Sequence, residues 1–102
     1  MVTPLGLTTD SRDDGSLVVR ATGELDLSNI DMFSEALTDA RKASADHHQL
    51  TIDLSGVDYL DSRAISVLFD HAENVEITVN PILMPVLKIS GLTEVATVRP
   101  AP

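Results

Sequence analysis

A serine at the predicted start of a helix is the residue in this sequence best placed to do chemistry. Ser62 and the preceding Asp61 follow residues 51–60, which begin with the alternation of a strand and run into a turn. The N–H groups and the positive dipole end of a helix favour a negative group, including a phosphate attached to the hydroxyl. The residues alone leave two roles open for Ser62: a phosphate acceptor, or a cap that hydrogen-bonds a helix N–H.

The neighbours of Ser62 carry alternatives of their own. Asp61 is expected to cap the helix, and it also shapes the loop that presents Ser62. Arg63 has three possible roles: it attracts the phosphate of ATP, pairs with a phosphate on Ser62, or forms an ion pair with Asp61. Ser66 lies one turn later and is either a second phosphorylation site or an ordinary exposed helix residue, which we favour.

Two acidic residues end an earlier predicted strand and are expected to approach the Ser62 loop. Asp26 and Glu24 either meet basic groups of a partner or form a solvated acidic rim, and the rim is favoured for Glu24. A metal site built from Asp26 and Asp61 needs at least one more oxygen ligand in a rigid cage, so no metal is expected.

Other arrangements that support catalysis are missing from the sequence. The three histidines, His47, His48 and His71, lack the i, i+4 spacing of a metal site and are expected in solvated loops. There is no cysteine, no glycine-rich phosphate loop and no Ser-His-Asp arrangement suggested by spacing. The sequence therefore predicts a protein that is not an enzyme and needs no cofactor.

The size and charge of the chain restrict its partners. With 102 residues, the chain is long enough for one domain with one core, spanning residues 1–102. Its net charge of −9 repels nucleic acid and anionic membranes, so a protein partner is expected. No apolar run approaches the roughly 20 residues of a membrane span, and we expect a cytoplasmic protein. The sequence makes no prediction of the oligomeric state.

Strands and helices alternate along most of the chain. Apolar residues at every third or fourth position define the helices, and alternating ones define the strands. The expected elements are a hairpin of two strands over residues 5–25, a helix over 29–44 behind a capping box from Ser28 to Asp31, a strand from Leu50, a short helix from Ser62, a strand over 75–79, a weak helix between Pro81 and Gly91 and a strand over 92–98.

Several details of these elements are also predicted. The second helix is expected to bury a stripe of five residues, namely Ala64, Ile65, Leu68, Phe69 and Ala72. Pro85 is expected to distort or delay the third helix, whose residues Leu83, Met84 and Leu87 are favoured as core rather than as a docking patch. The order β-β-α-β-α-β-α-β favours an α/β fold with a mostly parallel sheet, a core over about residues 4–98 and loose ends at 1–3 and 99–102.

This order and four short motifs resemble the STAS domain family over nearly the whole chain. The motifs are Gly23-Glu-Leu-Asp26, Asp53-Leu-Ser-Gly-Val-Asp-Tyr-Leu-Asp-Ser62, Asn80-Pro81 and Ser90-Gly91-Leu92. The best-known members that stand alone are bacterial anti-sigma factor antagonists. The resemblance implies a regulator of transcription that binds an anti-sigma factor with serine kinase activity, frees a sigma factor, and is released when its partner phosphorylates it.

The resemblance also assigns roles to residues. It makes Ser62 the phosphate acceptor, Asp61 the acid before it, and Asp26, Asp61, Ser62, Arg63 and Ser66 the expected contacts with the partner. The chain departs from the usual Asp-Ser-Ser/Thr-Gly-Leu at Arg63 and at Ala64, whose Cβ is expected to restrict the close approach that glycine allows. Two alternatives stay open: a structural STAS subunit of a signalling assembly or transporter, and a module that binds nucleotides.

Overall fold

The computed structural model describes residues 5–43 and 49–102. The elements in chain order are β1 (Gly6–Ser11), β2 (Leu17–Leu25), α1 (Ile30–Ala43), β3 (Leu50–Leu60), α2 (Ser62–Asp70), β4 (Val75–Val79), the 3₁₀ turn η1 (Pro81–Leu83), α3 (Met84–Ser90), α4 (Leu92–Val95) and β5 (Thr97–Pro100). No helix within these described residues is long and apolar enough to cross a membrane.

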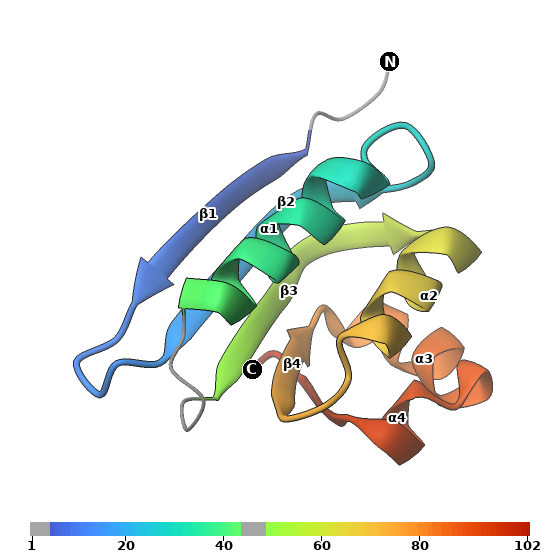
Figure 1. The fold of residues 1–102 in the computed structure, drawn as a ribbon. Helices are drawn as coiled ribbons and strands as arrows, with labels where there is room; N and C mark the ends of the chain where they lie inside the picture. The colour runs from blue at the N-terminus through green and yellow to red at the C-terminus, as the bar shows by residue number, and fades with distance from the viewer. Residues whose placement is uncertain (1–4, 44–48) are drawn as a thin grey trace.

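The five strands form one sheet in the order β1-β2-β3-β4-β5. The β1–β2 pair is the predicted antiparallel hairpin, and the other three pairings are parallel. Figure 1 shows α1 and α2 side by side on one face of the sheet, with α3 and α4 next to α2. The expected α/β fold with a mostly parallel sheet is confirmed.

The two faces of the sheet differ in chemistry because side chains alternate along each strand. The helix-covered face carries the core, including Val19, Ile52 and Ile77, all fully buried. On the other face, Arg20 of β2 bridges Asp10 of β1 at 3.4 Å and Asp53 of β3 at 3.0 Å. Exposed ion pairs of this kind add little stability, so they mainly keep this face polar.

The end of β3 departs from regular alternation. The pairing of β2 with β3 shifts register after Arg20, where Gly56 lies against Thr22. A Cβ at Gly56 would lie 2.7 Å from the Thr22 methyl carbon, so a larger residue here would force the Thr22 side chain to shift. Beyond the shift, Val57 and Leu60 are buried whereas Tyr59 is exposed. The irregular strand end thus turns an aromatic ring to the surface.

The start of α1 differs from the predicted capping box. The Ser28 hydroxyl donates to the Asp26 carboxylate instead of accepting from the helix, and the first helical hydrogen bond runs from the N–H of Phe33 to the carbonyl of Asn29. Helix α1 covers Ile30–Ala43, and its predicted end at residue 44 lies outside the described residues. The capping box is wrong because Asp26, two residues earlier, competes for the serine hydroxyl.

The C-terminal quarter contains one more helix than expected. The predicted distortion before Pro85 is confirmed, since a 3₁₀ turn precedes α3, and Gly91 ends α3 with a left-handed φ of 89°. The predicted strand over 92–98 is wrong at its start, because residues 92–95 form α4. Residues 99–100 are not loose: they belong to β5, and the N–H of Ala101 donates to Val79 at 2.7 Å.

Most of the predicted helix stripes are confirmed. Leu83 and Leu87 are core residues and Met84 packs against them. In α2, Ala64, Leu68 and the following Ala72 are buried and Ile65 is partly buried, but Phe69 is 36% exposed. The prediction for Phe69 is wrong because α2 ends one residue later, where the chain turns toward β4.

Candidate functional site

Asp61 makes the cap at the start of α2. Its backbone is extended, with φ −98° and ψ −179°, and its carboxylate accepts the N–H of Ala64 at 2.9 Å. The Asp61 N–H in turn donates to the carbonyl of Leu25 at 3.1 Å. The side chain therefore satisfies one free donor of the helix, while the backbone ties the loop to the end of β2.

Ser62 is the first residue of α2 and is exposed. Within the described residues its hydroxyl has no hydrogen-bond partner, because the capping role belongs to Asp61. The hydroxyl stands in the first turn of a nine-residue helix, where the dipole favours negative charge. The interpretation of Ser62 as a helix cap is wrong, and its hydroxyl is accessible for modification.

Arg63 and Ser66, the polar neighbours of Ser62 on α2, differ in whether their side chains have a partner within the described residues. Arg63 is exposed and forms no ion pair with Asp61 or with any other described residue. Of its three predicted roles, the pair with Asp61 is therefore wrong. The Ser66 hydroxyl donates to the Ser62 carbonyl at 3.1 Å, as serines inside helices commonly do, and its side chain is exposed as expected.

Asp26 shapes the loop between β2 and α1. Its carboxylate accepts the N–H of Ser28 at 2.9 Å and also the Ser28 hydroxyl. Asn29 closes the same loop: its side-chain oxygen accepts the Asp26 N–H at 3.0 Å, and its amide donates to the Glu24 carbonyl at 2.8 Å. Asp26 is thus held in place by its own loop, with its side chain partly exposed.

The loop of Asp26 and the loop of Ser62 lie at the same edge of the sheet. They follow the carboxyl ends of β2 and β3, neighbouring parallel strands in which Leu25 pairs with Leu60. Figure 1 shows the β2–α1 loop and the start of α2 at the same end of the sheet. The structure therefore brings together the predicted residues Asp26, Asp61, Ser62 and Arg63.

Exposed apolar side chains near these two loops were not predicted from the sequence. Leu27 in the β2–α1 loop is 68% exposed, and Met32 in the first turn of α1 and Tyr59 near the end of β3 are also exposed. Met32 falls off the buried stripe of α1, which is Ile30, Phe33, Leu37 and Ala40, and Leu27 lies in a loop outside any repeat. Apolar residues that break the repeat were the signal available in the sequence.

Ala64 lies inside the protein and is not part of its surface. Its side chain is fully buried in the core beneath α2. The expectation that its Cβ restricts the approach of a partner is wrong, because the methyl group points inward. The departure of this chain from the usual motif is exposed only at Arg63.

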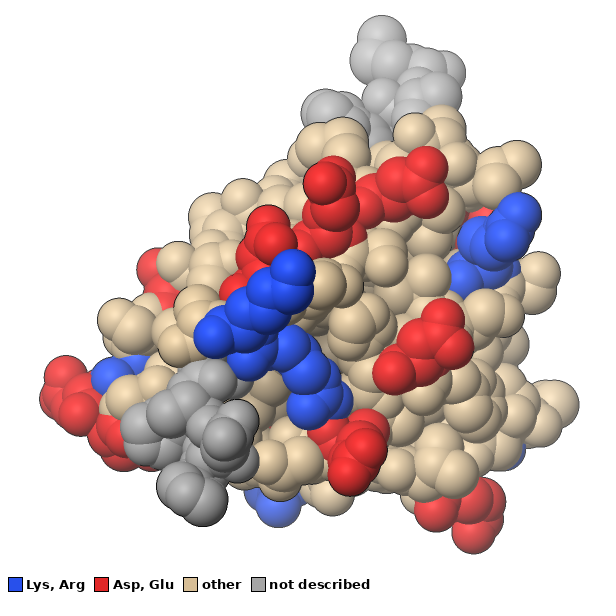
Figure 2. Space-filling model, viewed as in Figure 1, with Lys and Arg blue, Asp and Glu red and all other residues tan. Residues whose placement is uncertain are grey.

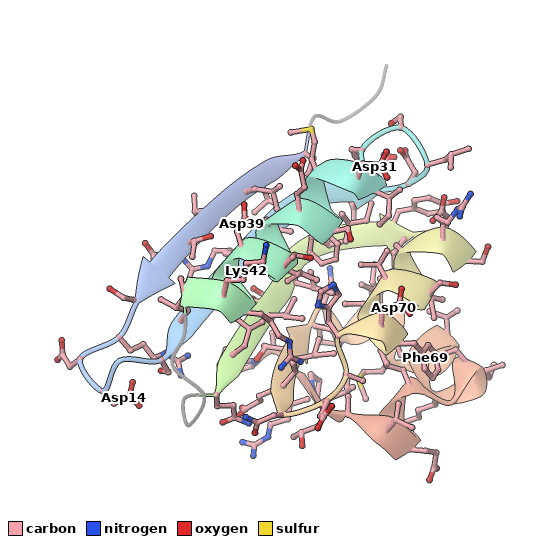
Figure 3. The ribbon with its side chains drawn as sticks, in the orientation of Figure 1. Asp14, Asp31, Asp39, Lys42, Phe69 and Asp70 are labelled. Carbon is pink, nitrogen blue, oxygen red and sulfur yellow. The ribbon has the colours of Figure 1, made fainter. Side chains whose placement is uncertain are left out.

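Arg41 ties the end of α2 to α1. Arg41, in the last turn of α1, donates to the His71 carbonyl at 2.8 Å and to the Glu73 carbonyl. Burial and the Arg41 charge hold the pKa of His71 below its ordinary value, against the opposing effect of Asp70. Figure 3 shows Asp70 and Phe69 at this end of α2. His71 lies in the turn that ends α2, outside a helix as expected, but it is partly buried rather than fully solvated, while His47 and His48 lie outside the described residues.

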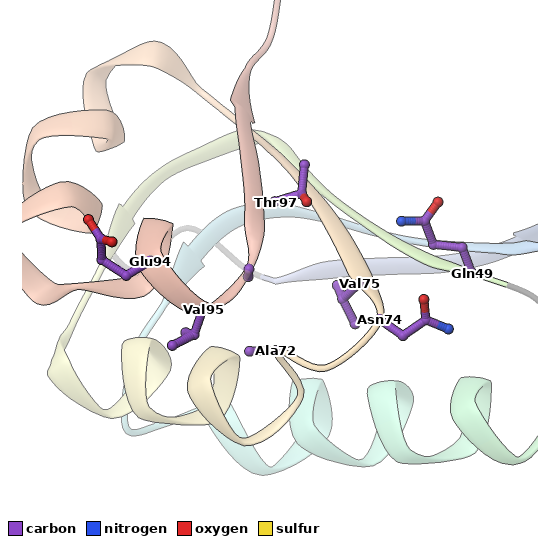
Figure 4. Close-up of a pocket in the computed structure, with 8 residues that line it drawn as sticks. Gln49, Ala72, Asn74, Val75, Glu94, Val95 and Thr97 are labelled. Atoms are coloured by element: carbon purple, nitrogen blue, oxygen red, sulfur yellow. The ribbon is translucent and has the colours of Figure 1, made fainter.

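A hollow of about 390 Å³ lies far from Ser62 along the sheet. Gln49, Asn74 and Thr97 line it, at the amino ends of β3, β4 and β5, and Figure 4 shows it in close-up. None of the residues predicted for the site lies there. Within the described part of the chain, no three histidine or acidic side chains group as metal ligands would.

The sequence model of the STAS domain family matches residues 9–100 of this chain, and this match decides the family. The chain belongs to the STAS domain family. Among functionally curated proteins, no sequence is significantly similar to this STAS domain.

Solved structures resemble this STAS domain over almost its full length. An anti-sigma factor antagonist from Mycobacterium paratuberculosis has a TM-score of 0.82 at 23% identity, covering 96% of this chain and 87% of its own. The unphosphorylated form of the anti-sigma factor antagonist SpoIIAA has a TM-score of 0.74 at 15% identity, with 95% and 89% covered. The phosphorylated Bacillus SpoIIAA has a TM-score of 0.67 at 14% identity, with 95% and 92% covered.

A membrane transporter contains the same fold. The murine anion transporter Slc26a9 has a TM-score of 0.64 at 15% identity, and the match covers 98% of this chain but 21% of the transporter. All these identities lie below 25%, so the likenesses establish the fold, and the role of this STAS domain must be argued from its own residues.

Proposed function

We propose that this STAS domain is an anti-sigma factor antagonist that binds an anti-sigma factor and thereby frees a sigma factor. The antagonist from Mycobacterium paratuberculosis and Bacillus SpoIIAA share its fold over almost its full length. The binding surface comprises the start of α2 and the β2–α1 loop, with Asp26, Asp61 and Arg63 around an exposed Ser62. The exposed apolar side chains of Leu27 and its neighbours add contact area for a protein.

The unoccupied hydroxyl of Ser62 is the observation that carries the regulatory part of the proposal. A serine at the N-cap position commonly caps its helix through its hydroxyl. Here Asp61 accepts the Ala64 N–H, and the Ser62 hydroxyl bonds to no described residue. A kinase can therefore modify Ser62 without breaking the cap of α2. Among the expected contacts, Ser66 is a weaker acceptor because its hydroxyl donates within the helix.

Phosphorylation of Ser62 changes the charge of this surface. A phosphate adds about −1.5 to −2 charges and three acceptor oxygens. The α2 N–H groups and the free Arg63 guanidinium can hold this group on the protein itself. A partner surface fitted to a neutral serine then meets a bulky anion beside Asp61, and the complex dissociates.

Incubation with ATP and the anti-sigma kinases of the source organism tests the proposal. We expect one phosphate, mapped by mass spectrometry to Ser62, and none on the Ser62→Ala variant. Ser66→Ala is the matched control, because it removes a hydroxyl one turn away and should be phosphorylated as well as the natural protein. Phosphate elsewhere, or none with every kinase, contradicts the switch.

A structural STAS subunit is the second candidate, supported by the likeness to the transporter Slc26a9. In that role Ser62 is not modified and the same edge of the sheet contacts other subunits. Purification of the tagged protein from its own cells distinguishes the two: an anti-sigma factor as the main partner supports the antagonist, and transporter subunits support the second candidate.

A further inference from the structure

The helical segment formed by η1 and α3, residues 81–90, carries apolar side chains on an inner and an outer face. Its inner face supplies the core residues Leu83 and Leu87. The outer face presents Ile82, Pro85, Val86 and Ile89 at spacings i, i+3, i+4 and i+7, all exposed, with Ile89 at 87%. We call these four residues the outer α3 stripe. Contiguous exposed apolar side chains commonly mark a contact surface, so another surface is expected to cover this stripe.

Charge decides which surface can cover it. Of the sixteen acidic residues, only Glu94 lies after Glu76, so the C-terminal quarter carries almost none of the net charge of −9. In Figure 2 the surface over α3 and α4 at the lower right is largely free of charged side chains, whereas acidic side chains gather over α1. Two copies of this chain repel each other elsewhere, but they can approach here without that penalty.

The two charges next to the stripe complement each other in a symmetric contact. Residues 80–98 contain one cation, Lys88, and one anion, Glu94. Both are exposed, and neither forms an ion pair within the described residues. A two-fold contact places residue i of one copy against residue j of the other and repeats the pair. Lys88 of each copy can then meet Glu94 of the other around an apolar centre.

We propose that the outer α3 stripe is the contact surface of a homodimer, flanked by reciprocal Lys88–Glu94 pairs. A standard interface uses roughly 20–30 residues a side. The stripe and its two charges are a smaller patch, so self-association is weak and depends on protein concentration. This proposal rests on the stripe and its two charges and does not depend on the proposed function.

Sedimentation equilibrium of the full chain, over about 1 µM to about 500 µM, measures this association. We expect a monomer at the lower end and a growing dimer fraction at the upper end. Ile89→Asp should weaken the dimer by roughly tenfold or more, because it buries an unpaired charge. Met32→Asp is the matched control: it alters an exposed apolar residue outside the stripe and should leave the dimer unchanged.

A charge exchange tests the reciprocal pairs. Lys88→Glu and Glu94→Lys should each weaken the dimer by placing like charges together, and the double variant should restore it. Circular dichroism checks that each variant is folded. The proposal is overturned by a monomer at every concentration, by a dimer that Ile89→Asp leaves intact, or by a double variant no tighter than the single ones. A monomer in which Ile89→Asp abolishes anti-sigma factor binding assigns the stripe to that partner instead.

Discussion

At the residue scale, the adjacent residues Asp61 and Ser62 have different structural roles. The Asp61 carboxylate caps α2 and the Ser62 hydroxyl makes no hydrogen bond within the described residues. The sequence predicted an exposed serine at a helix start, but it left two residues able to act as the cap. Only the backbone geometry decides between them, because the cap must lie one position before the first helical residue.

Substitution of these two neighbours should therefore have unequal effects. Asp61→Ala should lower the free energy of unfolding by about 0.5–2 kcal/mol, because it removes the cap. Ser62→Ala should change it by less than about 0.5 kcal/mol, as for surface residues without special contacts. Urea denaturation of both variants measures this difference. An equal loss in the two would mean that Ser62 stabilises the helix start.

The depressed pKa of His71 predicts a pH dependence of stability. Burial and Arg41 lower the pKa in the folded protein, against the effect of Asp70, so the unfolded chain takes up its proton first as the pH falls. The free energy of unfolding should decrease below about pH 6.5, the ordinary histidine value, and retain the His71 contribution above it.

Urea denaturation at a series of pH values, on the natural protein and on His71→Gln, isolates this contribution from His47 and His48. We expect the variant to show a shallower decrease on the acid side. Identical pH profiles for the two proteins would contradict the assignment to His71.

At the element scale, the sequence predicted the strands and the first two helices well because their apolar repeats are long. The sequence predicts one strand over residues 92–98, but residues 92–95 form the short helix α4. Four residues cannot distinguish a strand from one helical turn by repeat alone. Gly91, with its left-handed φ, separates α3 from α4, and Leu92 is the buried residue of α4.

Gly91 is accordingly a position where substitution should strain the backbone. Its φ of 89° disfavours any residue with a Cβ, although no atom lies within 4 Å of the place that the Cβ would take. Gly91→Ala should lower the free energy of unfolding by about 1–2 kcal/mol, and Gly91→Asn by less, because asparagine tolerates this region. Thermal unfolding followed by circular dichroism compares the two. A loss of the same size in both variants would mean that contacts, rather than φ, dominate.

At the scale of the whole molecule, the sequence shows that charge is unevenly distributed along the chain, but it does not show which surfaces are charged. Sixteen acidic and seven basic residues predicted a protein partner rather than nucleic acid. The structure adds that Arg20 and Arg99 pair with acidic residues on one face of the sheet. Acidic side chains gather on the earlier turns of α1, before the basic residues of its last turn, whereas the only charge in α3 is Lys88. Position in space, and not composition, separates these surfaces.

The net charge of −9 also predicts how salt affects stability. Repulsion among like charges destabilises the compact state, and salt screens it over about 10 Å at 0.1 M. The melting temperature should rise when sodium chloride increases from about 10 mM to about 200 mM. A melting temperature that falls over this range would mean that the ion pairs of Arg20 and Arg99 stabilise the fold by more than the repulsion destabilises it.

The binding of an anti-sigma factor to this STAS domain before and after phosphorylation of Ser62 tests the central claim most directly. Isothermal titration calorimetry compares the unmodified protein, the phosphorylated protein and the same sample after phosphatase treatment. We predict that the phosphate weakens binding by at least roughly tenfold, or about 1.4 kcal/mol, and that phosphatase restores it. Equal affinities for the unmodified and the phosphorylated protein would contradict a switch at Ser62.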